Sequence, residues 1–112
     1  MNTRVEKPWG YEIIWAQTDD YVGKLLHINS GHRLSKQYHK VKEETIYVLR
    51  GVLYNYNDAG EKHRLVPGES FHVSPGQVHR FEAGGTTAVE LMEVSTNHLD
   101  DVVRLDDDYQ RS

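Results

Sequence analysis

Short runs of strand-forming residues, separated by turn residues at close and regular intervals, constrain this sequence more than any other feature. The runs are rich in Val, Ile, Tyr, Phe, Leu and Thr, and turn pairs such as Pro67-Gly68 and Pro75-Gly76 lie between them. This pattern is typical of an all-β sandwich or barrel. We expect about nine strands, namely Tyr11–Gln17, Tyr21–Ile28, Arg33–His39, Glu44–Arg50, Val52–Asn57, Lys62–Val66, Ser70–Val73, His79–Ala83 and Ala88–Val94.

The segment Leu99–Tyr109 departs from the strand pattern. It places four aliphatic residues among five aspartates, with acidic residues near its start. Such a weak helical period indicates a short helical or irregular C-terminal tail laid against the barrel. The 112 residues contain no internal repeat, low-complexity stretch or linker, so we expect one domain over residues 1–112.

Composition and charge argue against several classes of partner. The formal net charge is −4 and no run of Lys and Arg is present, which argues against nucleic acid and membrane surfaces as partners. No apolar run reaches the length of a membrane span, and the polar start Met1–Arg4 lacks the apolar stretch of a secretory signal. We therefore expect a cytoplasmic protein.

The chain has no cysteine and seven histidines. Disulfides and thiolate metal sites are thereby excluded, which leaves imidazole, carboxylate and amide groups as metal ligands. Because strand side chains alternate between faces, Arg33, Ser35, Gln37 and His39 are expected on one side of their strand.

A buried carboxylate is the second sign of a metal site. Glu44 shares its strand face with Ile46 and Val48, which indicates that this face looks into the core. An isolated buried carboxylate is costly, so it is normally paired, neutralised or bound to a metal. His79, which shares a face with Phe81, can reach the same interior. Taken singly, each of these residues is more often surface or hydrogen-bonded core than ligand, and only their spacing argues otherwise.

That spacing resembles the two sequence motifs of the cupin family. Gly31, Gln37-Tyr38-His39, Glu44 and Gly51 fit G-x5-H-x-H-x4-E-x6-G, with Gln37 in place of the first histidine. Gly68 and Pro75–His79 are similar to the second motif, G-x5-P-x-G-x2-H, although Ser74 and Ala83 depart from the family pattern.

The resemblance implies a double-stranded β-helix, or jelly-roll barrel, that binds one divalent metal ion. The ligands that it implies are Gln37, His39, Glu44 and His79. These donor types favour zinc, iron(II), manganese, nickel or cobalt over calcium or copper(I), and we take zinc as the first choice.

A closer resemblance runs almost from end to end, to the C-terminal cupin of type II mannose-6-phosphate isomerases. In bifunctional enzymes this domain follows a mannose-1-phosphate guanylyltransferase domain. The likeness is carried by Lys7–Tyr11, Gly31–His39, Leu65–Ser70 and Asp100–Tyr109, and Gln37 is the residue that this subfamily has at its position. Nucleotidyl transfer is not expected, because these residues contain no Gly-rich nucleotide loop.

The closer resemblance implies a metal-dependent isomerase that interconverts mannose 6-phosphate and fructose 6-phosphate through an enediol. Cations must then meet the phosphate and the developing enediolate. By strand alternation, Lys24 and Arg33 are expected to face the cavity and are candidates for this role. Arg80 is a third candidate, because the His79-Arg80 pair resembles the family, although alternation points its side chain away from the ligands. All three cations are equally compatible with a solvated surface. No proton-transferring base can be assigned.

Two other functions are compatible with the same motifs. One is a non-enzymatic sugar-binding or regulatory cupin, since a fold alone does not imply activity. The other is a different metal-cupin enzyme, such as a dioxygenase or another aldose–ketose isomerase. We also expect a homodimer with the Trp9 and Trp15 region as its contact, unless both tryptophans instead cap the barrel.

Overall fold

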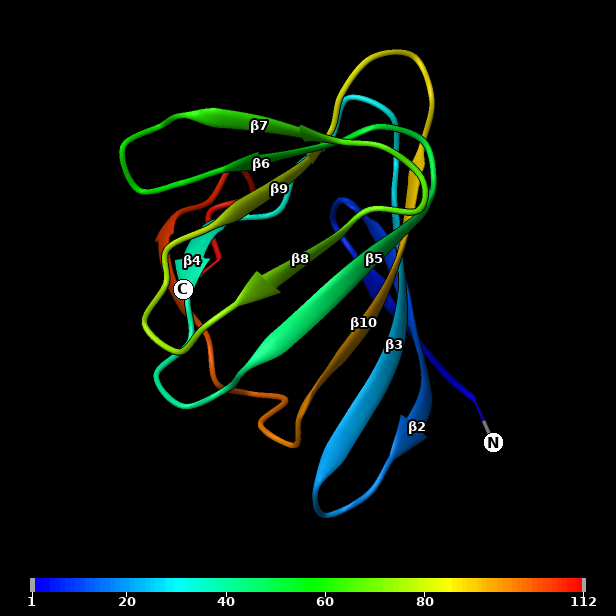
Figure 1. Ribbon diagram of the computed structural model, residues 1–112, viewed down its shortest axis with the longest axis vertical. Helices are drawn as coiled ribbons and strands as arrows, with labels where there is room; N and C mark the ends of the chain where they lie inside the picture. The colour runs from blue at the N-terminus through cyan, green and yellow to red at the C-terminus, as the bar shows by residue number, and fades with distance from the viewer. Residues whose placement is uncertain (1, 112) are drawn as a thin grey trace.

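A computed structural model describes residues 2–111 as antiparallel β-structure (Figure 1). The described part of the chain contains no helix, and therefore none that could span a membrane. Its strands are β1 (Thr3–Lys7), β2 (Gly10–Gln17), β3 (Tyr21–Ile28), β4 (Lys36–Tyr38), β5 (Glu44–Arg50), β6 (Leu53–Tyr56), β7 (Lys62–Leu65), β8 (Ser70–Val73), β9 (Arg80–Ala83), β10 (Val89–Thr96) and β11 (Val103–Asp106).

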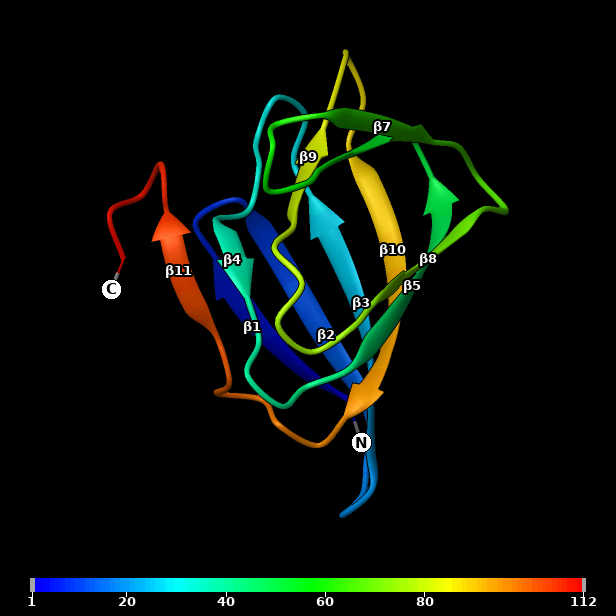
Figure 2. The same cartoon turned by 60° about the vertical axis from the view of Figure 1, so that its left-hand side comes forward.

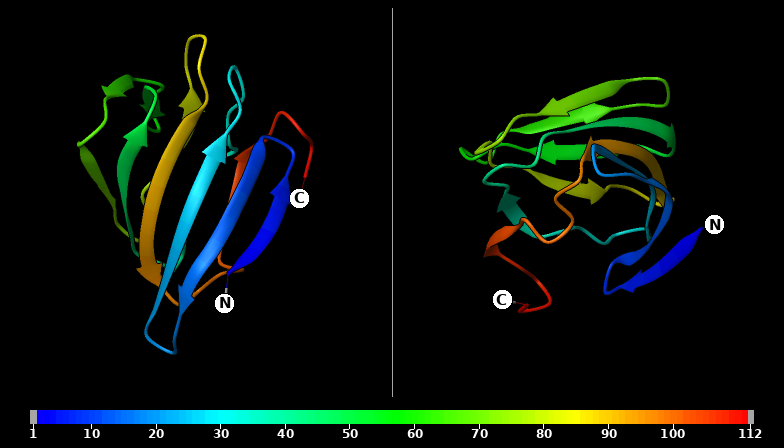
Figure 3. Two further views of the ribbon diagram at one scale, coloured as in Figure 1. Left: turned by 90° about the vertical axis from the view of Figure 1, so that its right-hand side faces the viewer. Right: turned by 90° about the horizontal axis from the view of Figure 1, so that it is seen from below.

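Three sheets surround a common interior, as the views in Figures 2 and 3 show. The large sheet has the strand order β1-β2-β3-β10-β5-β8, and the smaller sheets are β7-β6-β9 and β11-β4. The chain-distant pairs β3–β10 and β5–β10 lie at the centre of the large sheet. The expected all-β barrel is thus confirmed.

Side chains that point into the barrel divide it into an apolar end and a charged end. On β3, β5 and β10 the inward positions alternate with outward ones, as the strand period requires. Towards one end these positions hold Ile28, Val48 and Val89, which are fully buried. Towards the other end they hold the buried charged residues Lys24, Glu44 and Glu93. Backbone pairing therefore brings charges from three strands together at one mouth of the barrel.

Over its described residues, the C-terminal tail, expected to be helical or irregular, contains no helix: it is irregular in part and forms one short strand. Val103–Asp106 forms β11 and pairs with β4, with Val103 opposite Tyr38 and Arg104 opposite Gln37. The open edge of β4 provides the backbone partners that a short isolated helix would lack. Pairing across more than sixty residues of sequence overrides the weak local helical period.

One strand was not expected from the sequence, and another is shorter than expected. Thr3–Lys7 forms the edge strand β1, paired with β2, although its charged residues resemble a loop. The expected strand Arg33–His39 is regular only over Lys36–Tyr38, with single bridges from Arg33 to Glu82 and from Gln37 to His79. Strict alternation therefore does not extend back to Arg33.

Candidate metal centre

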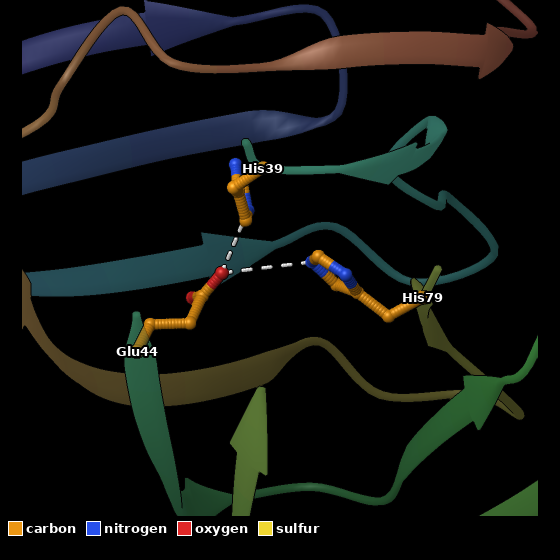
Figure 4. Close-up of side chains that lie close together, drawn as sticks. All are labelled: His39, Glu44 and His79. Carbon is orange, nitrogen blue, oxygen red and sulfur yellow. Dashed lines mark hydrogen bonds and ion pairs between the residues drawn. The ribbon is translucent and has the colours of Figure 1, made fainter. Parts of the chain in front are cut away.

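Three ligand-type side chains converge at the charged mouth of the barrel (Figure 4). His39 follows β4, Glu44 begins β5 and His79 precedes β9, so three separate segments supply them. Glu44 Oε1 lies 2.9 Å from His39 Nε2 and 3.6 Å from His79 Nε2. One ligand atom from each residue lies within 4.8 Å of the others, and all three side chains are buried.

Backbone carbonyl groups orient both imidazole rings. His39 Nδ1 lies 2.5 Å from the carbonyl oxygen of Asp101, and His79 Nδ1 lies 3.2 Å from that of Gln77. A carbonyl oxygen only accepts hydrogen bonds, so Nδ1 of each ring carries a proton, and His39 Nε2 in addition donates to the Glu44 carboxylate, a proton that a bound metal ion would displace. The Nε2 atoms consequently face Glu44, which is the arrangement of histidines that bind metal.

Gln37 lies beside this group through backbone pairing. Its N–H donates to the carbonyl of His79 at 3.0 Å, and the N–H of His79 donates back at 2.9 Å. Its side-chain amide donates to Ser35 Oγ at 3.1 Å, which leaves the amide oxygen for another partner. Gln37 and the triad line one cavity of about 100 Å³. Its role as a fourth ligand stays a prediction.

The protonation states favour cation binding. Burial alone would raise the pKa of Glu44, but the hydrogen bond from His39 and the charge of Lys42 lower it to about 2. Burial lowers the pKa of His79 to about 4. At neutral pH the site therefore presents a carboxylate and an uncharged His79 ring, and such donors suit zinc and other first-row divalent ions.

Two buried ion pairs adjoin the triad in the same cavity. Lys42 Nζ lies 3.1 Å from Glu93 Oε2, and Lys24 Nζ lies 3.2 Å from Glu12 Oε1. Burial and the nearby charge of Glu44 raise the pKa of Glu93 to about 7. Sequence reasoning missed Glu12, Lys42 and Glu93, although the alternation of Leu91, Glu93 and Ser95 on β10 offered a signal for Glu93.

The three predicted cations have different surroundings. Lys24 lines the cavity with the triad, whereas its described lining includes neither Arg33 nor Arg80. Arg33 makes two hydrogen bonds to Asp108, at 2.7 and 2.9 Å. Arg80 points away from the ligands and binds the carbonyl of Leu34 and the carboxylates of Asp106 and Asp108. These arginines thus hold the C-terminal segment in this structure.

Comparison with known proteins gives relatives that match this chain over one part of their length. The chain is 35% identical over 115 residues to mannose-1-phosphate guanylyltransferase ManC of Salmonella typhimurium, a match that covers 99% of this chain and 24% of that protein. The chain therefore spans about a quarter of the length of the curated relatives that it matches.

Solved structures show the same fold at lower identity. KdgF from Halomonas superposes with a TM-score of 0.77 at 21% identity and covers 88% of both chains. A sugar phosphate isomerase of the cupin superfamily from Silicibacter pomeroyi superposes with a TM-score of 0.72 at 20% identity, over 79% of this chain and 59% of that one. The cupin domain family matches residues 24–95, which include all four candidate ligands. With its barrel, its motif spacing and this match, the chain belongs to the cupin family.

Proposed function

We propose that this cupin is a metal-dependent sugar-phosphate isomerase that interconverts mannose 6-phosphate and fructose 6-phosphate through an enediol. The buried triad of His39, Glu44 and His79, in a cavity with further lysines and carboxylates, carries this proposal. The similarity to mannose-1-phosphate guanylyltransferases over the whole chain supports a substrate from mannose metabolism. The shared fold with a sugar phosphate isomerase is consistent with the reaction class.

The metal ion would be held by His39, Glu44 and His79, with Gln37 as the fourth ligand and zinc as the first choice. A bound divalent ion supplies positive charge for the oxygens of the enediolate. The protein supplies orientation, because the Nδ1 atoms of both histidines are fixed by backbone carbonyls. Burial of the triad excludes bulk water, so these charges act in a medium of low dielectric constant.

The remaining cavity residues include cations that could bind a phosphate and carboxylates that could transfer a proton. Lys24 and Lys42 are cations beside the triad, and we assign Lys24 to the phosphate or the enediolate. Glu12 and Glu93 are carboxylates that line the same cavity, and we assign the exchange of a proton with the substrate carbon to one of them. Arg33 and Arg80 reach substrate only when Asp106 and Asp108 release them, so Lys24 takes precedence over both.

An isomerase assay on metal-loaded protein tests this proposal. We expect conversion of mannose 6-phosphate to fructose 6-phosphate, and a kcat/KM at least about 100-fold lower in His39→Ala, because the metal supplies several kcal/mol of charge stabilisation. The matched control is His72→Ala, since His72 is half exposed and lies on the edge strand β8. Equal turnover in wild type and His39→Ala would rule out the metal-dependent mechanism. Sugar-phosphate binding without turnover would instead establish a binding cupin.

A further inference from the structure

One residue of the C-terminal segment accepts hydrogen bonds from three backbone N–H groups of the loop between His39 and Glu44. The Asp101 carboxylate accepts hydrogen bonds from the amides of Lys40 at 3.0 Å, Val41 at 2.7 Å and Lys42 at 2.8 Å. These three amides lower the pKa of Asp101 to about 2, so the carboxylate is charged throughout the neutral range. A charged acceptor forms stronger hydrogen bonds than a neutral one, which makes this contact a firm anchor for the loop.

The same residue also contacts a candidate ligand directly. The carbonyl oxygen of Asp101 accepts the hydrogen bond from His39 Nδ1, and His39 Nε2 then faces Glu44. Asp101 therefore fixes the loop through its side chain and the imidazole through its backbone. Rotation of the His39 ring would break the bond to Asp101, and displacement of the loop would move both His39 and Glu44.

Asp101 lies outside the part of the chain that matches the cupin family, which ends at residue 95. It follows β10 and precedes β11, in a segment whose own pairing with β4 brings it back to the barrel mouth. The loop between His39 and Glu44 is also joined to the end of β10, where the N–H of Glu43 donates to Thr96 Oγ1 at 3.2 Å. The segment between β10 and β11 therefore contacts both a candidate ligand and the loop that joins His39 to Glu44.

We propose that Asp101 is a positioning residue of the metal centre, which holds the loop from residue 40 to residue 42 and directs His39 Nε2 towards the ion. This inference rests on the proposed metal site. Groups that orient a ligating histidine raise its affinity for metal, and their loss typically weakens binding by about 10- to 100-fold. Without the Asp101 carboxylate, three N–H groups lose a charged acceptor and the loop gains conformational freedom that binding must then remove.

Zinc affinity of Asp101→Asn tests the inference, measured by competition with a chromophoric chelator. Asparagine keeps the size of the side chain but loses its charge and one of its two acceptor atoms. We expect a dissociation constant for Zn²⁺ about 10- to 100-fold higher than in wild type. The control is Asp100→Asn, which removes the same charge from the exposed neighbouring residue and is expected to leave the affinity unchanged.

Two further measurements separate positioning from a general effect on folding. Thermal unfolding of the metal-free proteins reports stability, and ¹⁵N NMR of the zinc-loaded proteins reports which nitrogen of His39 carries the proton, expected to be Nδ1 in wild type and a mixture of both nitrogens in the variant. Zinc affinity within about twofold of wild type, with lower stability, would make Asp101 purely structural and overturn the inference. If Asp101→Asn does not fold, Asp101→Glu displaces the carboxylate by one methylene and serves the same comparison. Absence of zinc binding to wild type would overturn the metal centre itself, and the inference with it.

Discussion

Glu44 is a fully buried carboxylate that nevertheless stays ionised, because its neighbours supply the stabilisation that water would give. His39 and Lys42 lower its pKa to about 2, whereas the pKa of Glu93, buried nearby, rises to about 7. The two carboxyl groups thus share one region, and Glu93 keeps its proton to a much higher pH than Glu44. Strand alternation with Ile46 and Val48 was sufficient to predict that Glu44 is buried, and the spacing of Glu44 from His39 and His79 then indicated a metal site.

Removal of the Glu44 charge is expected to abolish tight metal binding. In Glu44→Gln the carboxylate ligand becomes a neutral amide, so zinc affinity should fall by on the order of 100-fold or more. Chelator competition measures the affinity, and Glu43→Gln provides the control because Glu43 is an exposed neighbour on the same loop. Similar zinc affinities in Glu44→Gln and Glu43→Gln would place the ion elsewhere.

The stability of the metal-free protein should depend on pH through two opposing groups. The pKa of His79 is lowered from 6.5 to about 4, so the unfolded chain binds a proton that the folded chain does not, and stability falls as pH drops through this range. The pKa of Glu93 is raised from 4.5 to about 7, so the folded chain holds the extra proton and stability rises as pH drops from 7 to 4.5. Between about pH 6.5 and 4.5 the two effects largely cancel.

The variant Glu93→Gln should reveal the His79 contribution. Without the Glu93 proton, stability is expected to fall by roughly 3 kcal/mol between pH 6.5 and pH 4, at about 1.4 kcal/mol per pKa unit. Urea denaturation with a chelator present measures the free energy of unfolding at each pH. A wild-type protein that loses as much stability as the variant over this range would contradict the opposition between His79 and Glu93.

At the scale of elements, local patterns predicted the strands whose partners lie close by or whose faces are unambiguous. The expected strands over Tyr21–Ile28 and Glu44–Arg50 coincide with β3 and β5. By contrast, β11 forms because it pairs with the edge of the distant β4, and the local hydrophobic pattern of the sequence contains no sign of such a partner. The expectation that Arg33 shares a strand face with Gln37 assumed a regular strand. Leu34 and Ser35 are both buried and the chain there is not a regular strand, so alternation does not apply.

The attachment of β11 to the barrel depends on the ion pairs made by Arg80. Its side chain is only 6% exposed, and it binds Asp106 and Asp108 at 3.0 Å each. In Asp108→Ala, Arg80 loses one partner and Arg33 loses its own, so the free energy of unfolding should fall by about 1–3 kcal/mol. Urea denaturation checks this value, and Asp100→Ala, at an exposed position of the same segment, should change stability by less than about 0.5 kcal/mol.

At the scale of the whole molecule, the outer face of the large sheet, which is turned to the viewer in Figure 3 (left), carries most of the exposed large hydrophobic residues. Of the seven exposed large hydrophobic residues in the described part of the chain, five belong to the outward positions of β2, β3, β5 and β10. They are Trp15, Tyr21, Tyr47, Leu49 and Val94. Trp9, by contrast, is buried in the core, so only Trp15 of the expected contact region is available to a partner.

This face suits a second copy of the chain, in line with the homodimer expected from the sequence. Backbone register places the outward residues Ile13, Leu25, Met92 and Tyr47 in one row across the four inner strands β2, β3, β10 and β5, and the charged Arg4 lies at the end of this row on the edge strand β1. A two-fold pair would therefore oppose no like charges at its centre. The four inner strands have seven or eight residues, and at about 4.8 Å between strands and about 3.3 Å per residue they give a face of roughly 19 by 26 Å. This is below the 800 Å² or so per partner of a standard interface, so a dimer of that size would also include the shorter edge strands β1 and β8.

Analytical ultracentrifugation tests this dimer, and Val94→Glu is the variant that should dissociate it. Val94 is 52% exposed, so a glutamate is tolerated in the monomer, but in a symmetric interface each copy would bury an added charge beside an apolar surface. We expect wild type to sediment as a dimer and Val94→Glu to weaken association by at least about 100-fold. Leu105→Glu is the matched control, because Leu105 is 51% exposed on β11, away from the large sheet, and should leave the dimer intact. A monomeric wild type, or equal dissociation in both variants, would show that the apolar sheet face does not pair with itself.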